Sequence, residues 1–402
     1  MRAGQTIKQM TGYSAFIPSP LPPAPPIRMD DELVRLLSDA DRELGRLDGV
    51  ASVLPNPNLF VAMYVRQEAV LSSQIEGTQS TLEDLLQFEA DAEGYHVPKD
   101  IEEVVNYVRA MNYGLERLKE LPLSLRLIRE IHAELLKGVR GGHRTPGEFR
   151  TSQNWIGPEN CTLTTATFVP PPPHEMHQAL DNLEKFLNDT TSFPALIHCG
   201  LAHAQFETVH PFLDGNGRVG RLLITFLLCQ QGVLQRPLLY LSHYLKGRRA
   251  EYYDRLMAIR NDGDWEGWLK FFLRGVQDVS RQATDKSRAI INLRDLHRQN
   301  LSRITLGINL LDYLFEQPIV TVRMVEKHLQ CSFATANKLV GRFERLGLLK
   351  QLLPWKSWNR SFLSDSYMTL FEEARKPSLQ QEDTAQTTVA DTAVPSLGKD
   401  SK

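Results

Sequence analysis

The sequence lacks a hydrophobic run long enough to cross a membrane. None of its 402 residues lies in an apolar stretch that approaches the roughly 20 residues needed to span a bilayer. The N-terminal stretch, MRAGQTIKQMTGYSAF, also lacks the apolar core of a signal peptide. These absences predict a cytoplasmic protein with no membrane partner.

Cysteine is scarce, and charge of either sign is not in excess. Cys161, Cys199, Cys229 and Cys331 lie far apart and form no CxxC pair, which excludes a disulfide framework or a zinc knuckle. The net charge of -2 gives the chain as a whole no attraction to nucleic acid or anionic membrane. A GxxxxGK(S/T) motif is absent as well, so there is no P-loop.

What is present is a globular composition with helical periodicity. Apolar residues make up 42% of the chain and charged residues 23%. From Asp30 to about Arg298, apolar residues recur at three- and four-residue spacing, which predicts a mainly α protein. Two segments interrupt this pattern. The proline-rich residues 17–27 are expected to lie extended along the surface, and residues 141–173 predict a loop with a hairpin.

Residues 301–375 have the pattern of a separate unit. Three short helices are followed by a turn-rich strand pair, an order typical of a winged helix. Ten Lys/Arg and seven Asp/Glu give this stretch a charge of +3. Lys338, Arg342 and Arg345 on the expected recognition helix are a weaker footprint than strong DNA modules show, so DNA binding, target docking and dimer contact all stay open. The polar residues 376–402 are expected to be disordered.

The segment 210–221, HPFLDGNGRVGR, carries the strongest chemical signal. It contains GxGxxG, but a dinucleotide fold needs a strand before this motif and an acidic residue about 20 positions after it. A helical pattern precedes the motif here, and the residues about 20 positions after it are LLYLSH, which contain no acid. The dinucleotide reading therefore fails.

The physical logic of such a loop still applies. Glycines at a helix N-terminus allow backbone N–H groups to converge on an anion. Gly215, Asn216 and Gly217 directly precede an apolar helix. Arg218 and Arg221 are three residues apart and so share one face of that helix. Two guanidiniums beside a nest of amides predict a site for two or three phosphates.

Asp214 and His210 add two further chemistries. A carboxylate beside bound phosphates requires a bridging cation, for which Mg²⁺ is the natural choice. A neutral imidazole can take a proton from an attacking hydroxyl. An imidazole with its ordinary pKa predicts activity that rises with pH between about 6 and 7.

This segment resembles the Fic family signature, HxFx(D/E)GNGRxxR, at every defined position. The resemblance covers roughly residues 60–290 and implies a helical bundle with a small β-hairpin flap near residues 152–172. It implies an enzyme that moves AMP from ATP onto a hydroxyl of a target protein. In that reading His210 is the general base, Asp214 binds Mg²⁺ and Phe212 anchors the loop in the core.

The same resemblance implies the nucleotide contacts. Asn216, Gly217 and Arg218 would hold the α- and β-phosphates, and Arg221 would hold the terminal phosphate. One tyrosine of the pair Tyr252 and Tyr253 would pack on adenine, with plain helix packing as the alternative. The other expected nucleotide contacts are Glu76, Val209, Gly215, Val219 and Gly220.

An acidic motif lies upstream, in SSQIEG. Ser72 and Glu76 are four residues apart, so they share one helical face. With Gly77 they resemble the Fic inhibitory motif, (S/T)xxxE(G/N). The resemblance implies that Glu76 pairs with Arg221 and shifts ATP into an unreactive pose. A partly buried, charge-assisted pair contributes about 1.5–3 kcal/mol.

The expected function is an autoinhibited protein adenylyltransferase that acts on Ser, Thr or Tyr of target proteins and on itself, with a homodimer as a further arrangement. Removal of AMP by the same glutamate stays open. The alternatives are a DNA-binding regulator with a nucleotide-sensing Fic domain, or a Fic enzyme that transfers another nucleotide or group. The expected segments are an N-terminal arm and helix (1–56), a region with the inhibitory helix (57–122), a Fic core (123–300), the winged-helix-like unit (301–375) and the tail (376–402).

Overall fold

The computed structural model is mainly helical, as predicted, and describes residues 2–10, 12–52, 58–91, 96–139, 145–158, 160–189, 191–301 and 305–371. The expected tail and residues 141–144 lie outside the described residues. None of the described helices is long and apolar enough to cross a membrane. The helices are α1 (Asp31–Ser52), α2 (Asn58–Ile75), α3 (Leu82–Glu89), α4 (Ile101–Arg117), α5 (Leu125–Leu135), α6 (Pro173–Leu187), α7 (Ala195–Val209), α8 (Asn216–Gln230), α9 (Ser242–Gly247), α10 (Arg249–Asp262), α11 (Trp265–Leu301), α12 (Thr305–Glu316), α13 (Val322–Leu329), α14 (Phe333–Arg345) and α15 (Asp365–Met368).

Helices α7 and α8 form the centre of the molecule. Residues 196–209 of α7 are all buried, and α8 is buried over most of its length. A helix that is apolar on every side must be enclosed on every side. The two helices pack against each other, α6 and α11 pack on α7, and α4 and α5 pack on α8. The loop between α7 and α8 is the glycine-rich motif, which therefore lies at the core.

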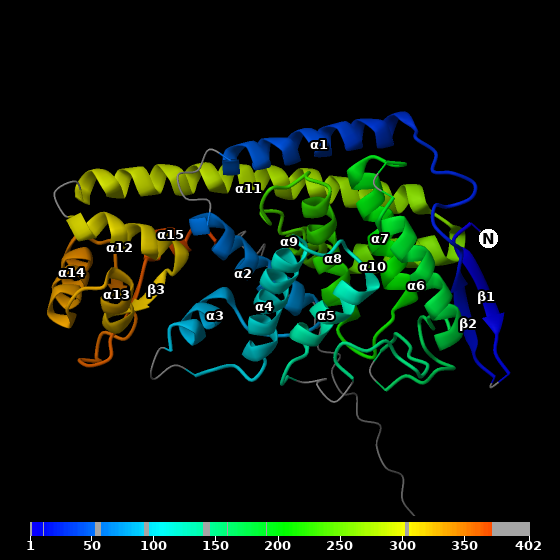
Figure 1. The fold of residues 1–402 in the computed structure, drawn as a ribbon, viewed down its shortest axis with the longest axis horizontal. Helices are drawn as coiled ribbons and strands as arrows, with labels where there is room; N and C mark the ends of the chain where they lie inside the picture. Colours follow the sequence, from blue (N-terminus) through cyan, green and yellow to red (C-terminus); the bar gives the residue numbers. More distant parts are fainter. Residues whose placement is uncertain are drawn as a thin grey trace, which may run out of the picture.

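The long helix α11 joins the two ends of the molecule. It has 37 residues, so it is about 55 Å long, and α1 lies along it (Figure 1). Near the N-terminus, β1 (Gly4–Lys8) and β2 (Ser14–Pro18) form an antiparallel hairpin that the sequence analysis did not anticipate. The proline-rich residues 17–27 begin on β2 and then continue without regular structure, as expected.

The segment predicted to be a hairpin flap, residues 152–172, folds back on itself through a single bridge. Ile156 and Phe168 exchange backbone hydrogen bonds of 2.8 and 3.0 Å. The expected strand after Cys161 forms turns instead. The hydroxyl of Thr165 accepts a bond of 2.9 Å from the backbone N–H of Thr162, so local side-chain bonds replace a second strand.

The C-terminal unit, residues 305–371, contains the predicted helices and strands. Helices α12, α13 and α14 pack with an antiparallel sheet in the order β3-β5-β4, formed by β3 (Ile319–Thr321), β4 (Lys350–Gln351) and β5 (Ser361–Leu363). Its core includes Val325, Val340 and Phe343. Its classification as a winged helix stays a prediction.

Close helix contact at Gly114 gives a stability test. A Cβ added there would overlap the ring of Phe226, so α4 approaches α8 only because this residue is glycine. We expect Gly114→Ala to lower the free energy of unfolding by about 1–3 kcal/mol through overpacking. Gly45→Ala on α1, where an added Cβ meets nothing within 4 Å, should raise it by about 0.5–1 kcal/mol. Urea unfolding measures both, and an equal effect of the two would contradict the contact.

Candidate functional site

The site is built where the chain reverses between α7 and α8. His210 ends α7 with a φ of 49°, in the left-handed region that non-glycine residues rarely adopt. Gly215 precedes α8 with a φ of 76°. These two residues bring the imidazole back beside the N-terminus of α8. The backbone N–H groups that begin α8 have no partners within the helix, so they can bind an anion.

The interior of the loop is held by side chains. Asn216 accepts from the backbone N–H of Phe212 and donates to its carbonyl, both at 2.8 Å. Phe212 is fully buried and stacks on the ring of His132 at 3.7 Å. These two bonds use the amide oxygen and one amide N–H to close the loop, and the backbone N–H of Asn216 remains for a ligand. The anchor role expected of Phe212 agrees with this packing.

His132 of α5 holds the loop between α7 and α8 through hydrogen bonds of its ring. Its Nδ1 accepts from the backbone N–H of Gly147 at 2.9 Å, which leaves Nε2 to donate to the carbonyl of Asp214 at 3.0 Å. Burial lowers the pKa of His132 to about 4, so the ring is neutral at ordinary pH. A neutral ring with this tautomer is what the two bonds require.

The backbone at His210 is held by Arg150, a buried residue. Its guanidinium donates to the carbonyls of His210 at 3.0 Å and of Ser152 at 3.1 Å, and to Pro171. Asn154 also donates to the His210 carbonyl, at 3.2 Å. Residues 150–154 thus connect the backbone of His210 to Pro171, just before α6. Sequence analysis missed Arg150 because its partners are backbone carbonyls, which leave no motif.

The imidazole of His210 lies in a cationic, enclosed setting. Burial, followed by the charges of Arg260 and Arg150, lowers its pKa to about 3, although Glu76 opposes the shift. The ring is therefore neutral, as the proposed base requires. The sequence expectation of an ordinary imidazole pKa was wrong, because the burial of this ring and the arginines that face it both depend on distant parts of the chain.

A cleft of about 630 Å³ opens in front of His210. Tyr252 is buried and its hydroxyl lies 2.9 Å from Nε2 of His203, whereas Tyr253 is 38% exposed. Of the two tyrosines, Tyr253 is therefore the one with ring surface free for a ligand. The residues lining the opposite wall include Trp155, Ile156 and Phe168 of the folded-back segment.

Arg221 meets the predicted acidic motif from α2. It donates to the Ser72 hydroxyl at 2.8 Å, to the Ser72 carbonyl at 3.0 Å and to the Glu76 carboxylate at 2.6 Å. Burial opposes the charge of both partners, but their attraction lowers the pKa of Glu76 and raises that of Arg221. A Cβ on Gly217 would overlap the same carboxylate. The Glu76 carboxylate, which comes from the end of α2, thus packs against the first turn of α8.

Arg218 has a different environment. It donates to Glu103 of α4 at 3.0 Å and lies 3.8 Å from the Asp214 carboxylate, while its Nε is buried and unpartnered among the described residues. These groups, with Glu76, line a second cavity of about 180 Å³. Glu103 was missed by sequence analysis, because nothing in IEEVVN marks one glutamate as a partner of a residue 115 positions away.

Asp214 fits the expected Mg²⁺ ligand in its chemistry. Its side chain is 37% exposed, faces the smaller cavity and accepts from the backbone N–H of Gly215. The described residues contain no group of three His, Cys, Asp or Glu that would enclose a metal by themselves. A single carboxylate is nonetheless sufficient for Mg²⁺ when phosphate oxygens and water complete its shell.

Three expected nucleotide contacts do not line either cavity. Val209 and Val219 are fully buried, and their side chains belong to the apolar core. At Gly220, a Cβ would overlap the carboxylate of Glu207, so that residue covers the glycine. Burial raises the pKa of Glu207 to about 7. The other expected residues, apart from Ser72 and Gly77, line one or both cavities: Glu76, His210, Asp214, Gly215, Asn216, Gly217, Arg218, Arg221, Tyr252 and Tyr253.

Comparison with known families matches this architecture. The Fic/DOC family N-terminal model matches residues 34–116, and the Fic/DOC family model matches residues 122–228. The two matches together cover just under half of the chain and show a Fic/DOC region in it. The second match includes α7, α8 and the loop between them, so the family's defining region coincides with the site.

Related proteins agree with the Fic assignment. A protein named protein adenylyltransferase Fic from Drosophila grimshawi is 30% identical over 189 residues, which cover 46% of this chain and 34% of that protein. The protein of the same name from Drosophila ananassae is 28% identical over 220 residues, covering 52% and 39%. The chain thus spans little more than a third of the length of these relatives.

A solved structure shares the fold. The crystal structure of a Fic family protein from Desulfovibrio desulfuricans G20 aligns with a TM-score of 0.55 at 19% identity, covering 84% of this chain and 97% of that one. The alignment extends well beyond the two matched family regions, and at this identity it supports the Fic fold alone.

Proposed function

We propose that this protein is an autoinhibited adenylyltransferase that moves AMP from ATP onto a Ser, Thr or Tyr hydroxyl of a target protein and of itself. The observation that carries the proposal is a neutral imidazole, His210, beside an anion-binding helix N-terminus and a cleft of about 630 Å³. The printed names of the relatives, protein adenylyltransferase Fic, support the same reaction class.

The phosphate chain of ATP would lie along the first turn of α8. Backbone N–H groups at Asn216 and Gly217 and the guanidiniums of Arg218 and Arg221 supply positive charge there. Asp214 would hold Mg²⁺ together with phosphate oxygens, and the ion would neutralise charge on the leaving pyrophosphate. The exposed ring of Tyr253 would pack against the adenine of ATP.

His210 would act on the acceptor hydroxyl. A neutral imidazole takes the proton as the hydroxyl oxygen attacks the α-phosphorus, and the bond to pyrophosphate breaks. Arg150 and Asn154 hold the backbone of His210, so the position from which the ring extends is set before a ligand binds. The folded-back segment at Ile156 would present the target chain to this ring.

Autoinhibition would follow because Arg221 is already paired with the Glu76 carboxylate. Its Nε and Nη2 donate to Ser72 and Glu76, and its Nη1 lies next to Gly217. The Glu76 carboxylate therefore occupies the position that a terminal phosphate would take on α8. A phosphate can bind there only after the carboxylate leaves.

Arg218 would be positioned rather than blocked. Glu103 binds one edge of its guanidinium, and Nε and Nη2 have no hydrogen-bond partner among the described residues. A guanidinium held on one edge presents its other edge to a ligand in a fixed orientation. Glu103 would thus align Arg218 for a phosphate without competing for the same donors.

Replacing the inhibitory Glu76 tests the reaction class. We expect Glu76→Gly to raise AMP transfer, including self-modification, at least tenfold, because the lost pair is worth about 1.5–3 kcal/mol. The measurement is incorporation from ATP labelled at the α-phosphate, with intact mass to identify one added adenylate. Glu76→Gln, which removes the charge and keeps the volume, should also activate.

The controls separate the alternatives. His210→Ala in the Glu76→Gly background should abolish transfer, and ATP labelled at the γ-phosphate should leave the protein unlabelled. Label from CTP, GTP or UTP in preference to ATP would replace AMP transfer by another nucleotidyl transfer. Absence of any label, with ATP still bound, would favour a sensing domain over an enzyme.

The depressed pKa of His210 predicts a pH profile. An imidazole with a pKa of about 6.5 would be only about one tenth neutral at pH 5.5, whereas one near 3 is fully neutral there. Transfer by Glu76→Gly should therefore stay nearly constant between pH 5.5 and 7.5, since the Glu76 charge, which raises this pKa, is absent from the variant. A tenfold fall towards pH 5.5 that persists in a Glu207→Gln variant would contradict the assigned environment.

Arg218 alignment has a matched pair of variants. In the Glu76→Gly background, Glu103→Gln should lower transfer by about tenfold, because the charge-assisted bond that orients Arg218 becomes a neutral one. Glu102→Gln removes an exposed carboxylate from the same turn and should have little effect. Increased transfer in Glu103→Gln would instead make Glu103 a second brake.

A further inference from the structure

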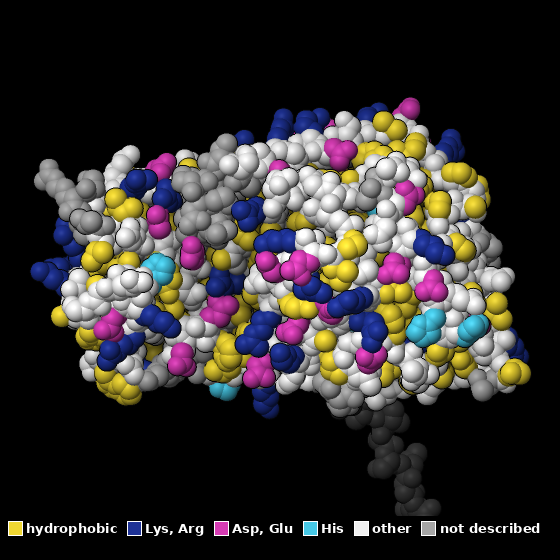
Figure 2. Space-filling model, viewed as in Figure 1, with side chains coloured by type: hydrophobic (Ala, Val, Ile, Leu, Met, Phe, Trp, Pro, Cys, Tyr) yellow, Lys and Arg dark blue, Asp and Glu magenta, His cyan; other side chains and the backbone are white. Residues whose placement is uncertain are grey.

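A second charged surface lies in the C-terminal unit, outside the Fic cleft. Between residues 322 and 363 there are eight Lys/Arg and two Asp/Glu, a net charge of +6 in a chain whose total is -2. The rest of the chain therefore carries -8. On the face shown in Figure 2, acidic and basic side chains are interspersed across the middle of the molecule. Residues 305–321 and 364–371 add three acidic residues and no Lys/Arg, so the unit as a whole carries +3. Its positive charge is concentrated in residues 322–363, and such a concentration is typical of a surface for a polyanion.

The backbone of this unit forms a helix-turn-helix. α13 ends at Gln330, in the left-handed region with a φ of 49°, and α14 begins two residues after Cys331 with Ser332 as its N-cap. The Ser332 hydroxyl accepts from the backbone N–H of Thr335 at 3.2 Å. The buried faces of α13 and α14 pack together, which fixes the angle at which α14 is presented.

The outer side of α14 is exposed and cationic. Lys338, Arg342 and Arg345 are exposed, and none of them forms an ion pair with a described residue. Thr335 and Asn337 are exposed on the same helix. In Figure 1 α14 lies at the end of the molecule opposite the N-terminus. The helix has 13 residues, about 20 Å, which is long enough to lie in a groove.

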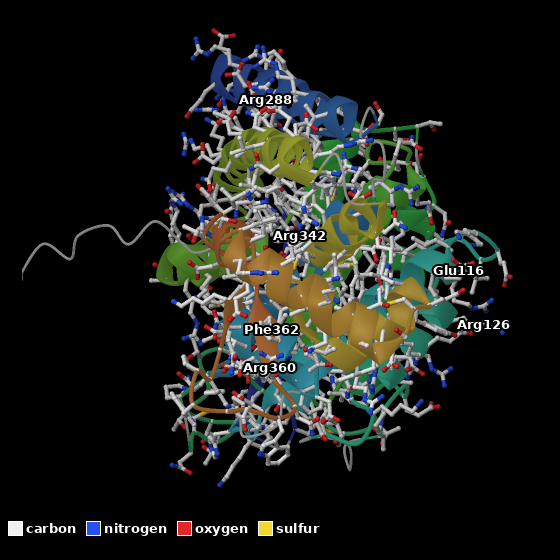
Figure 3. All side chains as sticks on the ribbon, turned by 90° about the vertical axis from the view of Figure 1, so that its left-hand side faces the viewer. Glu116, Arg126, Arg288, Arg342, Arg360 and Phe362 are labelled. Atoms are coloured by element: carbon white, nitrogen blue, oxygen red, sulfur yellow. The ribbon has the colours of Figure 1, made fainter. Side chains whose placement is uncertain are left out.

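A loop beside α14 adds a second contact region. The chain between β4 and β5 exposes Trp355 by 81% and Trp358 by 64%, and the Lys356 amine lies 4.9 Å from the Trp358 ring centre. Arg360, at the end of this loop, donates to the Asn337 side chain at 2.8 Å. That bond couples the loop to α14. Figure 3 views this end of the molecule and labels Arg342 and Arg360.

We propose that this unit binds duplex DNA, with α14 in the major groove and the 352–360 loop against the adjacent backbone. The major groove is about 12 Å wide and admits an α-helix, and arginine, lysine and asparagine are the side chains that read base edges there. The +6 charge supplies the attraction to phosphates. This binding is independent of nucleotide transfer at His210.

The geometry favours a duplex over the other anionic partners. A single strand would be held by aromatic rings spaced along a basic channel, whereas here the cations lie on one straight helix. A groove of about 630 Å³ between α14 and the loop has Asp91 as its only acidic lining residue among those the structure describes, so phosphates would approach the outer face of α14 rather than that wall.

Fluorescence anisotropy with a labelled duplex of about 30 base pairs and random sequence tests this surface on the full chain. We expect a Kd of about 10 µM or tighter at 100 mM KCl. The triple variant Lys338→Gln, Arg342→Gln, Arg345→Gln should bind at least tenfold more weakly. Its slope of log Kd against log salt should be smaller by about 3, one for each lost phosphate contact.

A matched control removes the same charge elsewhere. Lys119→Gln, Arg126→Gln, Arg288→Gln replaces residues that are 69%, 72% and 62% exposed and lie outside the unit (Figure 3 labels Arg126 and Arg288). This variant should bind DNA within twofold of the unsubstituted chain. Equal weakening in the two triple variants would overturn the proposal, because binding would then depend only on total charge.

Other outcomes identify a different partner. No binding at 50 mM KCl, or equal binding of a single strand of the same length that Trp355→Ala abolishes, would overturn duplex recognition. Selection from a random duplex pool should yield a sequence preference that Asn337→Ala alters. His210→Ala should bind DNA normally, and the α14 triple variant should retain AMP transfer in the Glu76→Gly background, so failure of one function is distinguishable from failure of the other.

Discussion

The buried guanidinium of Arg221 needs an anion, and the arrangement of the helices around α8 supplies one. An arginine that is 2% exposed pays a large desolvation penalty unless a carboxylate and several acceptors surround it. Ser72 and Glu76 provide these acceptors from one face of α2. The same requirement would be met equally well by a phosphate. The buried Arg221 must be paired with an anion, but either a carboxylate or a phosphate can fill that role. This is the physical basis both for the packing of α2 on α8 and for the proposed regulation.

The loop that carries the chemistry is held mostly by groups that do no chemistry. A non-glycine residue at a φ of 49° costs free energy, and such a conformation persists only where the surroundings fix it. At His210 the surroundings are the guanidinium of Arg150 and the amide of Asn154 on one side, and on the other the Asn216 amide that closes the turn. The backbone that carries the imidazole is therefore fixed before any ligand arrives, which reduces the entropy that binding would otherwise have to overcome.

What the sequence predicted, and what it did not, follows from the range of the interactions. Helices, the turn at Gly215 and the shared face of Ser72 and Glu76 depend on spacing within one segment, and these expectations agree with the structure. Glu103 and Arg150 act through partners far along the chain, and the low pKa of His210 depends on cations from other elements. The 152–172 hairpin was reduced to one bridge because threonine side chains bond locally, a competition that strand propensity does not measure.

The two arginines of α8 are also linked through the helices that bind them. After Glu76 the chain turns, and Gln79 and Ser80 donate to the carboxylate of Asp100, the residue just before α4. One turn later, Glu103 holds Arg218. The end of α2 and the start of α4 are therefore joined by the Asp100 bonds. A displacement of the whole end of α2 that draws Glu76 away from Arg221 must either break these bonds or move the first turn of α4, and with it Arg218. Since Arg218 stays aligned only if that turn stays in place, release of the carboxylate without loss of alignment requires motion confined to residues 76–78, where Gly77 at a φ of 102° gives the backbone its freedom.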